Sequence, residues 1–421
     1  MTNSIPSITL ERIPDEVYDE ITQYLVDKYH FLNGSENGGR MRLANYFVRI
    51  KKPLVEKFID FIQEIVIKTQ HNAFPKMTLP EGFESSEGNL TKHEKLGGFS
   101  FGSFDMAVTS TTLQSIEFQA IATYPFTAAK LNTLLKNKLD LVDAYAFAND
   151  KNTTWEDFIN IYQRIMGGGD KKPLVLTDRN LNHQKTNFEF YATQKELGLP
   201  VDIVDIESIF EENQSLFYKT ATNKVQKIER LYNRILPNEA IYDDNYPNHP
   251  KWQLRYDKTY RDLTFINHPQ RLFEISKRLL PYLEHPFNPP ALELQHSAAQ
   301  FLKGKLLYSD YVWKHKDGAA GFSLFLLPTE AILMKLIANE TISNYIAQRK
   351  VNYHIFKTDD GLDKIIELRF MTAHTANTLN IIPMARIGHV LKNANNSLSY
   401  KIHFGDNNKP GYGFAPVLIF E

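Results

Sequence analysis

One strand–helix–strand segment constrains the fold of this chain more than any other feature of its sequence. A short apolar run at 173–177 is followed by a helical pattern at 186–197, then by Gly198 and a second apolar run at 200–205. Strand, helix and strand in this order make up the unit of a parallel sheet. The chain is therefore expected to contain an α/β domain, and residues 227–235 are expected to add a further strand to its sheet.

Changes in composition divide the chain into three expected domains. Residues 1–166 form an N-terminal domain, and the glycine-rich linker at 167–172 opens the α/β domain, residues 167–265. Residues 266–421 form the last domain, in which strands and helices follow one another. The other expected elements are helices at 15–29, 53–69, 127–143, within 267–290 and from Pro328, strands within 103–119, 311–327, 345–356, 365–371 and 380–391, and loops at 33–40 and 75–98.

Composition excludes several classes of protein. The chain has 421 residues, of which 43% are hydrophobic, and a formal net charge of -1, which gives no electrostatic footprint for nucleic acid. The lack of cysteine excludes disulfides, thiolate zinc sites and cysteine nucleophiles. The first residues do not resemble a signal peptide, and no run is apolar enough to span a bilayer. We expect a cytoplasmic protein that binds neither nucleic acid nor membrane.

The stretch SFDMAVTSTTLQSIEFQAIATYP, residues 103–125, carries three groups that could bind a hard metal ion. Asp105 closes one strand-like run, the polar residues 109–112 suit a hairpin loop, and the next run carries Glu117 and Gln119. Residues two apart on a strand point to the same face. The side-chain oxygens of these three residues suit Mg²⁺, which keeps several water ligands and is also coordinated by substrate phosphates. A sheet with one solvent-exposed face and no metal site would show the same pattern, and this alternative stays open.

A lysine-containing loop forms a second candidate site. Lys314 ends a predicted strand, and Lys316 opens the loop KDGAAG. The small residues of this loop, among them Gly318 and Gly321, let backbone N–H groups approach an anion closely. Lysines beside such a loop can hold phosphates. A plain hairpin with solvated lysines is the alternative interpretation.

Two further segments could complete a nucleotide site. Lys277 lies in ISKRLLPYL, within the helix expected in 267–290 and before the prolines that end it. Gln348 ends a predicted strand, and the backbone from Gln348 through Lys350 to Val351 could face the edge of an adenine base.

The order of helix lysine, strand lysine, glycine loop and strand end resembles the ATP-grasp superfamily over residues 267–391. The acidic strand and Glu-x-Asn strand that close such a domain are missing from the chain end GYGFAPVLIFE. Asp105 is followed twelve residues later by Glu117-Phe-Gln-Ala. This pattern resembles the two metal-binding strands that end an ATP-grasp domain, placed near the N-terminus by circular permutation. The glutathionylspermidine synthetase family and the eukaryotic-type glutathione synthetases have this order. Their Lys-x-Leu-Leu-Pro helix is similar to the segment that begins at Lys277.

The resemblance implies a mixed α/β, circularly permuted ATP-grasp fold with an additional parallel-sheet substrate domain. Three features depart from the family pattern. Gln119 stands where the family has asparagine, and Ser103 stands where it has an arginine two residues before the first acid. The loop HKDGAAGF also lacks the family's proline and Arg-Glu pair. These departures leave the particular substrate, and the activity, open.

Other arginines could supply the positive charge that Ser103 does not. Arg369 and Arg386 lie on predicted strands of the last domain, and Arg234 ends a predicted strand of the middle domain. A guanidinium group can clamp a phosphate or carboxylate with two parallel hydrogen bonds, although a surface ion pair is the alternative. Thr123 and Tyr124 could line an acceptor pocket.

The resemblance implies an ADP-forming carboxylate–amine ligase, which activates an acid as an acyl phosphate and lets an amine displace the phosphate. Asp105, Glu117 and Gln119 would hold one or two Mg²⁺ ions, and Lys277 and Lys314 would bind the phosphates of ATP. The partners would be a small carboxylic acid and an amine, such as a peptide or polyamine. Two alternatives remain: an ATP-binding protein of this fold without ligase activity, and an interaction module that binds no nucleotide.

Overall fold

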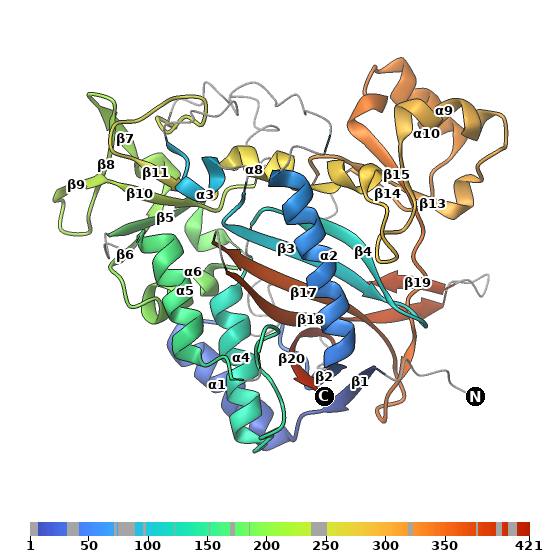
Figure 1. Cartoon of the computed structure of the whole chain (residues 1–421), viewed down its shortest axis with the longest axis horizontal. Coiled ribbons are helices and arrows are strands. Elements are labelled where there is room, and N and C mark those ends of the chain that lie inside the picture. The colour runs from blue at the N-terminus through green and yellow to red at the C-terminus, as the bar shows by residue number, and fades with distance from the viewer. Residues whose placement is uncertain are drawn as a thin grey trace.

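The computed structural model describes residues 7–31, 42–70, 74, 89–95, 98–121, 123–150, 152–168, 173–184, 186–236, 251–318, 323–375, 378–392, 398–402 and 411–421. Within these residues the chain forms four sheets flanked by helices, which confirms the predicted mixed α/β class. The parallel sheet and a smaller antiparallel sheet lie at opposite ends of the molecule, with the largest sheet between them (Figure 1). The loop expected at 33–40, most of that at 75–98 and most of the linker at 167–172 lie outside the described residues.

The largest sheet has nine strands and joins segments from both ends of the chain. Its main path is β1-β2-β20-β18-β17-β3-β4, with β16 paired to β17 and β19 to β18. The bounds are Ile8–Arg12 (β1), Tyr46–Lys51 (β2), Phe101–Val108 (β3), Leu113–Gln119 (β4), Phe356–Lys357 (β16), Asp363–His374 (β17), Leu379–Lys392 (β18), Leu398–Lys401 (β19) and Gly413–Phe420 (β20). Because β3 pairs antiparallel with β17, the strands predicted within 103–119 meet those predicted at 365–371 and 380–391. The sequence patterns do not predict β1, β2 or β20.

The hairpin of β3 and β4 forms one edge of this sheet. The prediction that Asp105 closes a strand is wrong, because β3 continues beyond it, paired with β17 as far as Ala107 and with β4 as far as Val108. The hairpin loop expected at 109–112 is confirmed by hydrogen bonds between its two ends. Glu117 lies directly opposite Asp105, and a β-bulge beside this pair makes Ile116 the extra residue of β4.

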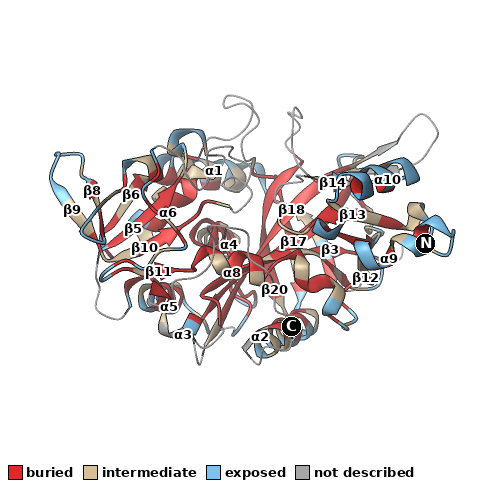
Figure 2. Ribbon diagram, turned by 90° about the horizontal axis from the view of Figure 1, so that it is seen from above, coloured by how far each residue is buried: buried red, intermediate tan, exposed pale blue. Residues whose placement is uncertain are grey.

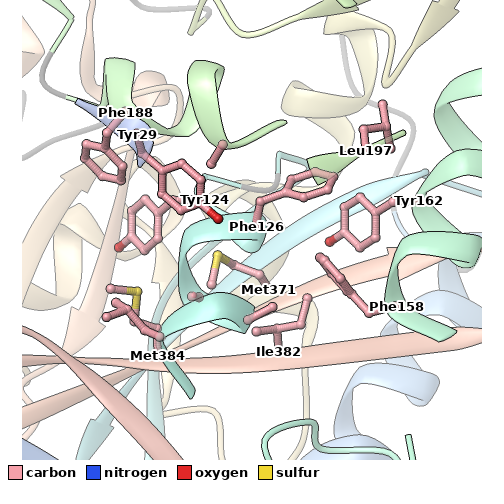
Figure 3. Packing of buried hydrophobic residues seen from close by; sticks show 14 of the residues in the cluster. Tyr29, Tyr124, Phe126, Phe158, Tyr162, Phe188, Leu197, Met371, Ile382 and Met384 are labelled. Atoms are coloured by element: carbon pink, nitrogen blue, oxygen red, sulfur yellow. The ribbon is translucent and has the colours of Figure 1, made fainter. Parts of the chain in front are cut away.

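Helices cover both faces of the largest sheet, and its strands β3, β17 and β20 are buried along most of their length (Figure 2). On one face Phe58 of α2 stacks on Phe370, with ring centroids 3.9 Å apart. On the other face Phe126, Phe158 and neighbouring aromatic residues pack against Met371 (Figure 3). The helices are α1 (Asp15–Tyr29), α2 (Lys52–Gln70), α3 (Lys92–Lys95), α4 (Pro125–Lys138), α5 (Trp155–Gly167) and α6 (Asn187–Glu196). No helix within the described ranges has the length and apolarity to cross a membrane.

The predicted strand–helix–strand unit is confirmed as β5, α6 and β6. The sheet β11-β10-β5-β6 is parallel throughout, with bounds Leu174–Asp178 (β5), Val201–Asp205 (β6), Arg230–Asn233 (β10) and Thr264–Ile266 (β11). Residues 230–233 of the strand expected at 227–235 join this sheet as β10, which confirms that part of the prediction, but the single strand is wrong because the chain changes partners at Glu229. Residues before it form β9 (Val225–Ile228), which joins β7 (Phe210–Glu212) and β8 (Ser215–Lys219) in an antiparallel sheet.

The fourth sheet, β12-β15-β13-β14, is antiparallel. Its strands are Ala291–Glu293 (β12), Tyr311–His315 (β13), Leu324–Phe325 (β14) and Tyr345–Arg349 (β15). The helices α9 (Leu294–Leu302) and α10 (Glu330–Ala338) pack on it around the buried Trp313. The helix expected within 267–290 is present as α8 (Pro269–Glu274) and the 3₁₀ helix η5 (Lys277–Tyr282). Other 3₁₀ helices are η3 (Leu181–His183), η4 (Ile206–Ser208), η6 (Tyr308–Asp310) and η7 (Ile342–Asn344).

Candidate functional site

A pocket lies where β4, η5 and the residues after β13 meet. Its lining comes from several distant segments of the chain: Glu117, Phe118, Gln119, Leu236, Leu272, Phe273, Ser276, Lys277, Lys316, Asp317 and Gly318. Five of these residues are among those that the sequence predicts to bind a metal ion or phosphate: Glu117, Gln119, Lys277, Lys316 and Gly318. The fold therefore brings members of both predicted sets into one pocket.

Strand β4 brings two of the predicted metal ligands to the wall of this pocket. Phe118 is 1% exposed and stacks on Phe104 in the core, whereas the Glu117 side chain keeps 24% of its surface exposed and Gln119 is half-buried. This alternation agrees with Glu117 and Gln119 sharing one face of the strand. A carboxylate side chain and an amide side chain thus both line the pocket wall.

Lys277 pairs with Glu117 across this site. Lys277 Nζ and Glu117 Oε1 lie 2.5 Å apart, and the same ammonium group donates to the carbonyl of Gly318. The 3₁₀ helix begins here because the hydroxyl of Ser276 accepts the backbone N–H of Arg278. A predicted phosphate ligand and a predicted metal ligand therefore neutralise each other.

The turn at 315–318 is held against η5 and β12. Arg278 donates two parallel hydrogen bonds to Asp317, Nε to Oδ1 and NH2 to Oδ2, each 2.6 Å long. Lys316 Nζ lies 2.6 Å from Glu293 Oε2. The only sequence signal for Arg278 and Asp317 is that each stands next to a predicted phosphate-binding residue.

Lys314 and Gln348 do not line the pocket. They instead join the sheet β12-β15-β13-β14 to β4. Lys314 Nζ donates to the carbonyl of the bulge residue Ile116 at 2.6 Å, and Gln348 Nε2 donates to that of Ser115 at 3.0 Å. Both side chains are buried. The pKa of Lys314 is lowered to about 7, mainly by burial; the charges of Glu117 and Asp105 oppose this shift, and that of Lys277 adds to it.

Lys350 and Val351 are not among the residues that line this pocket. Lys350 and Val351 follow β15 and are half-buried, and the backbone N–H of Lys350 donates to the carbonyl of Asp310 at 2.8 Å. Gly321 lies outside the described residues. The role of these three residues in nucleotide binding stays a prediction.

Two predicted arginines converge on Asp105. Arg369 lies opposite Asp105 in the β17–β3 register and donates Nε to Oδ1 at 2.6 Å and NH2 to Oδ2 at 2.5 Å. Arg386 NH2 donates to Oδ2 at 2.6 Å and also forms an ion pair with Glu367. Burial alone would raise the pKa of Asp105, but the charges of the two arginines outweigh it and hold that pKa well below its ordinary value.

Arg369 also contacts the residues expected to line an acceptor pocket. Its NH1 donates to Tyr124 Oη at 2.9 Å and to Thr123 Oγ1 at 3.2 Å. Ser103, which replaces the family arginine, is buried and donates its hydroxyl to the carbonyl of Ile121 at 2.5 Å. The positive charge near Asp105 therefore comes from β17 and β18 and not from the position of Ser103.

Arg234 lies at the carboxyl ends of the parallel strands β10 and β5. Its Nε is 4.0 Å from Oδ2 of Asp178, the last residue of β5, and its NH2 donates to Thr186 Oγ1 at 3.4 Å. The chain continues from β5 to β6 on one side and from β10 to β11 on the other. Ligands of open α/β sheets bind where strand order reverses in this way. Sequence inspection missed Asp178, whose signal is its place at the end of an apolar strand.

The residues on β4 fit a magnesium ion better than Asp105 does. Among the described residues no group of three or more acidic or histidine side chains converges as a metal site. Glu117 and Gln119 nevertheless offer two oxygen ligands in a pocket with lysines, and Mg²⁺ typically takes one or two carboxylates, waters and substrate phosphates. Both oxygens of Asp105 accept from guanidinium groups. The prediction that Asp105 binds a metal ion stays a prediction.

Comparison with known proteins adds one finding, at the level of the fold. A scan against protein-family models and a search of curated proteins both find no match. Among solved structures, the chain is similar to a glutathione synthetase-like effector from Globodera pallida in its apo form. The TM-score is 0.54 at 12% sequence identity, over 89% of this chain and 94% of that chain. At this identity the similarity shows a shared fold and nothing more specific.

Proposed function

We propose that this chain is an ATP-dependent carboxylate–amine ligase with a circularly permuted ATP-grasp fold. One observation carries the proposal: Lys277, Lys316 and Gly318 line the same pocket as Glu117 and Gln119. Cationic groups and a tight turn suit phosphates, and the two oxygen ligands suit the metal ion that accompanies them. The fold shared with a glutathione synthetase-like effector supports the proposal.

The pairing of strands supports the permuted order. β3 and β4, from the expected N-terminal domain, complete the sheet that contains β17 and β18, from the expected last domain. In the proposal these two domains form one catalytic unit. Residues 167–265 form the substrate domain, whose parallel sheet places Arg234 at its carboxyl edge.

In this proposal Lys277 and Lys316 bind the phosphates of ATP. Glu117 and Gln119 would hold Mg²⁺, and Asp105 could join them only by giving up an arginine. The ion would offset the charge of the phosphates during transfer. When nucleotide enters, Lys277 exchanges Glu117 for a phosphate oxygen, so neither side chain is left as a bare buried charge.

The proposed reaction has two steps. The carboxylate oxygen of the acid attacks the γ-phosphorus, the bond to the β-γ bridging oxygen breaks, and ADP leaves. The amine nitrogen then attacks the acyl carbon, inorganic phosphate leaves, and the nitrogen loses a proton. Arg369 and Arg386 stabilise the charge on the transferring phosphoryl group, and Arg234 holds the acid at the edge of the parallel sheet.

A second candidate is an ATP-binding protein without ligase activity. It is favoured by the complete pairing of the Asp105 oxygens with arginines and by Ser103, which points to the backbone. In this case the chain would bind ATP without transferring phosphate.

Phosphate release separates the two candidates. The purified chain is incubated with ATP, Mg²⁺ and pools of carboxylic acids and amines, and inorganic phosphate is measured. Release that requires both an acid and an amine, and that is lost in Arg369→Met, supports the ligase. ATP binding with no acid-dependent release from any pool contradicts it and leaves the second candidate.

A further inference from the structure

We propose that Arg278 and Asp317 form a positioning clamp that sets the placement of the pocket lysines for nucleotide phosphates. The inference rests on the proposed function, because it assigns these residues to the same pocket. We do not assign either side chain as a phosphate ligand, because Arg278 donates to Asp317 and Asp317 is itself an anion. Their proposed role is to hold the two segments that carry Lys277 and Lys316.

The clamp joins two segments that each carry a pocket lysine. Arg278 follows Lys277 on η5, and Asp317 lies between Lys316 and Gly318 in the turn after β13. Both hydrogen bonds of the pair are 2.6 Å long, and the side chains keep only 15% and 11% of their surface exposed. A bidentate pair of this kind fixes orientation as well as distance.

The turn is also held by hydrogen bonds that do not involve η5. The backbone N–H of Asp317 donates to His315 Nδ1 at 3.2 Å, and the N–H of Gly318 donates to the carbonyl of His315 at 3.2 Å. The N–H of Lys316 donates to the carbonyl of Asn344 at 2.8 Å. These bonds shape the turn on its own sheet, whereas the bond from Arg278 fixes the turn to η5 and so to Lys277.

Because Asp317 is negatively charged, the direction in which its removal changes ATP affinity tests the inference. Asp317 lines the pocket, so its carboxylate lies where the anionic phosphates would bind. If only local charge mattered, removing this negative charge would strengthen ATP binding. If the clamp positions the lysines, the same change weakens binding, because the turn loses its bidentate tie to η5 and keeps only the hydrogen bond from Lys277 to the carbonyl of Gly318.

A second arginine–aspartate pair provides a matched control. Arg255 donates Nε to Asp257 Oδ1 at 3.2 Å and NH2 to Oδ2 at 2.9 Å, so it has the same two-bond arrangement. Neither residue lines the pocket. Changes to this pair report the general cost of breaking such a bridge.

The test is calorimetric titration of ATP with Mg²⁺ into wild type, Asp317→Asn, Arg278→Lys, Asp257→Asn and Arg255→Lys, with thermal unfolding of each variant. We expect Asp317→Asn and Arg278→Lys each to weaken ATP binding about tenfold, with wild-type affinity in both controls. Arg278→Lys keeps the charge but loses the fork geometry.

Three results would overturn the inference. Tighter binding by Asp317→Asn would show that charge alone matters, and unchanged binding by Arg278→Lys would show that geometry does not. An equal loss in the control pair would reduce the clamp to a general stability effect. If wild type itself binds no ATP, the proposed function fails together with this inference, whereas the other results leave the proposed function standing.

Discussion

Replacing Asp105 by asparagine is expected to lower the free energy of unfolding by about 3–5 kcal/mol, the cost of breaking a buried ion pair from one side. The carboxylate is 4% exposed and accepts three hydrogen bonds from Arg369 and Arg386. Oδ1 accepts one of these bonds and Oδ2 accepts two, so the NH₂ group of asparagine removes one or two of them, and the rest lose the charge of their acceptor. Hydrogen bonds to charged groups are worth about 1.5–3 kcal/mol each, which gives a similar range. Arg386 keeps Glu367, so the uncompensated charge is mainly that of Arg369.

Urea unfolding followed by tryptophan fluorescence measures this change. Asp257→Asn is the control, because Asp257 has the same bidentate partner geometry with a side chain that is 31% exposed, and its loss should cost about 0–1 kcal/mol. The pKa of Asp105 is held below its unfolded value, so the stabilisation is present above about pH 4 and is lost as the pH falls further. The double variant Asp105→Asn/Arg369→Met should recover some of the loss. A loss no larger than that of the control would refute the reasoning.

Three further predictions concern other regions of the molecule. Burial raises the pKa of Glu189 to about 7, so the folded chain binds more protons than the unfolded chain between about pH 4.5 and 7. Wild type should therefore lose stability relative to Glu189→Gln as the pH rises through that window, by at most about 1.4 kcal/mol per pH unit; parallel pH profiles would contradict this. Arg234→Met should bind ATP as wild type does and lose acid-dependent phosphate release, and weakened ATP binding would remove Arg234 from the acid site. Gln348→Leu should cost about 1–3 kcal/mol of stability, because the buried carbonyl of Ser115 loses its donor, and an unchanged urea midpoint would show that this contact does not join the sheets.

Local sequence patterns were sufficient for the strand–helix–strand unit and for the β3–β4 hairpin. Apolar runs with a helix between them predict β5, α6 and β6, and the polar residues 109–112 predict the hairpin loop. Local sequence patterns cannot predict the β-bulge at Ile116, because it depends on pairing with β3 and on the contact with Lys314 from another sheet. Strand β20 was also missed, since it is buried on both faces and shows no alternation, and Pro416 interrupts its apolar run.

The candidate site could be predicted by residue type but not by contact. Spacing on one strand was enough to place Glu117 and Gln119 on one face, and the resemblance singled out Lys277. No local pattern can tell that Lys277 pairs with Glu117, because the two residues are far apart in the chain and meet only when η5 packs against β4. The same holds for Asp105 and Arg369, whose meeting depends on the register of β3 against β17.

The most direct test of the account is ATP binding by calorimetry, with and without Mg²⁺, on wild type and on Glu117→Ala. Lys258→Met serves as a control, because Lys258 pairs with Glu211 at 2.6 Å and does not line the pocket. The account predicts that wild type and the control bind ATP more tightly with Mg²⁺ and that this difference disappears in Glu117→Ala. Absence of ATP binding by wild type, or the same Mg²⁺ dependence in Glu117→Ala, would contradict the assignment of this pocket to a magnesium–nucleotide complex.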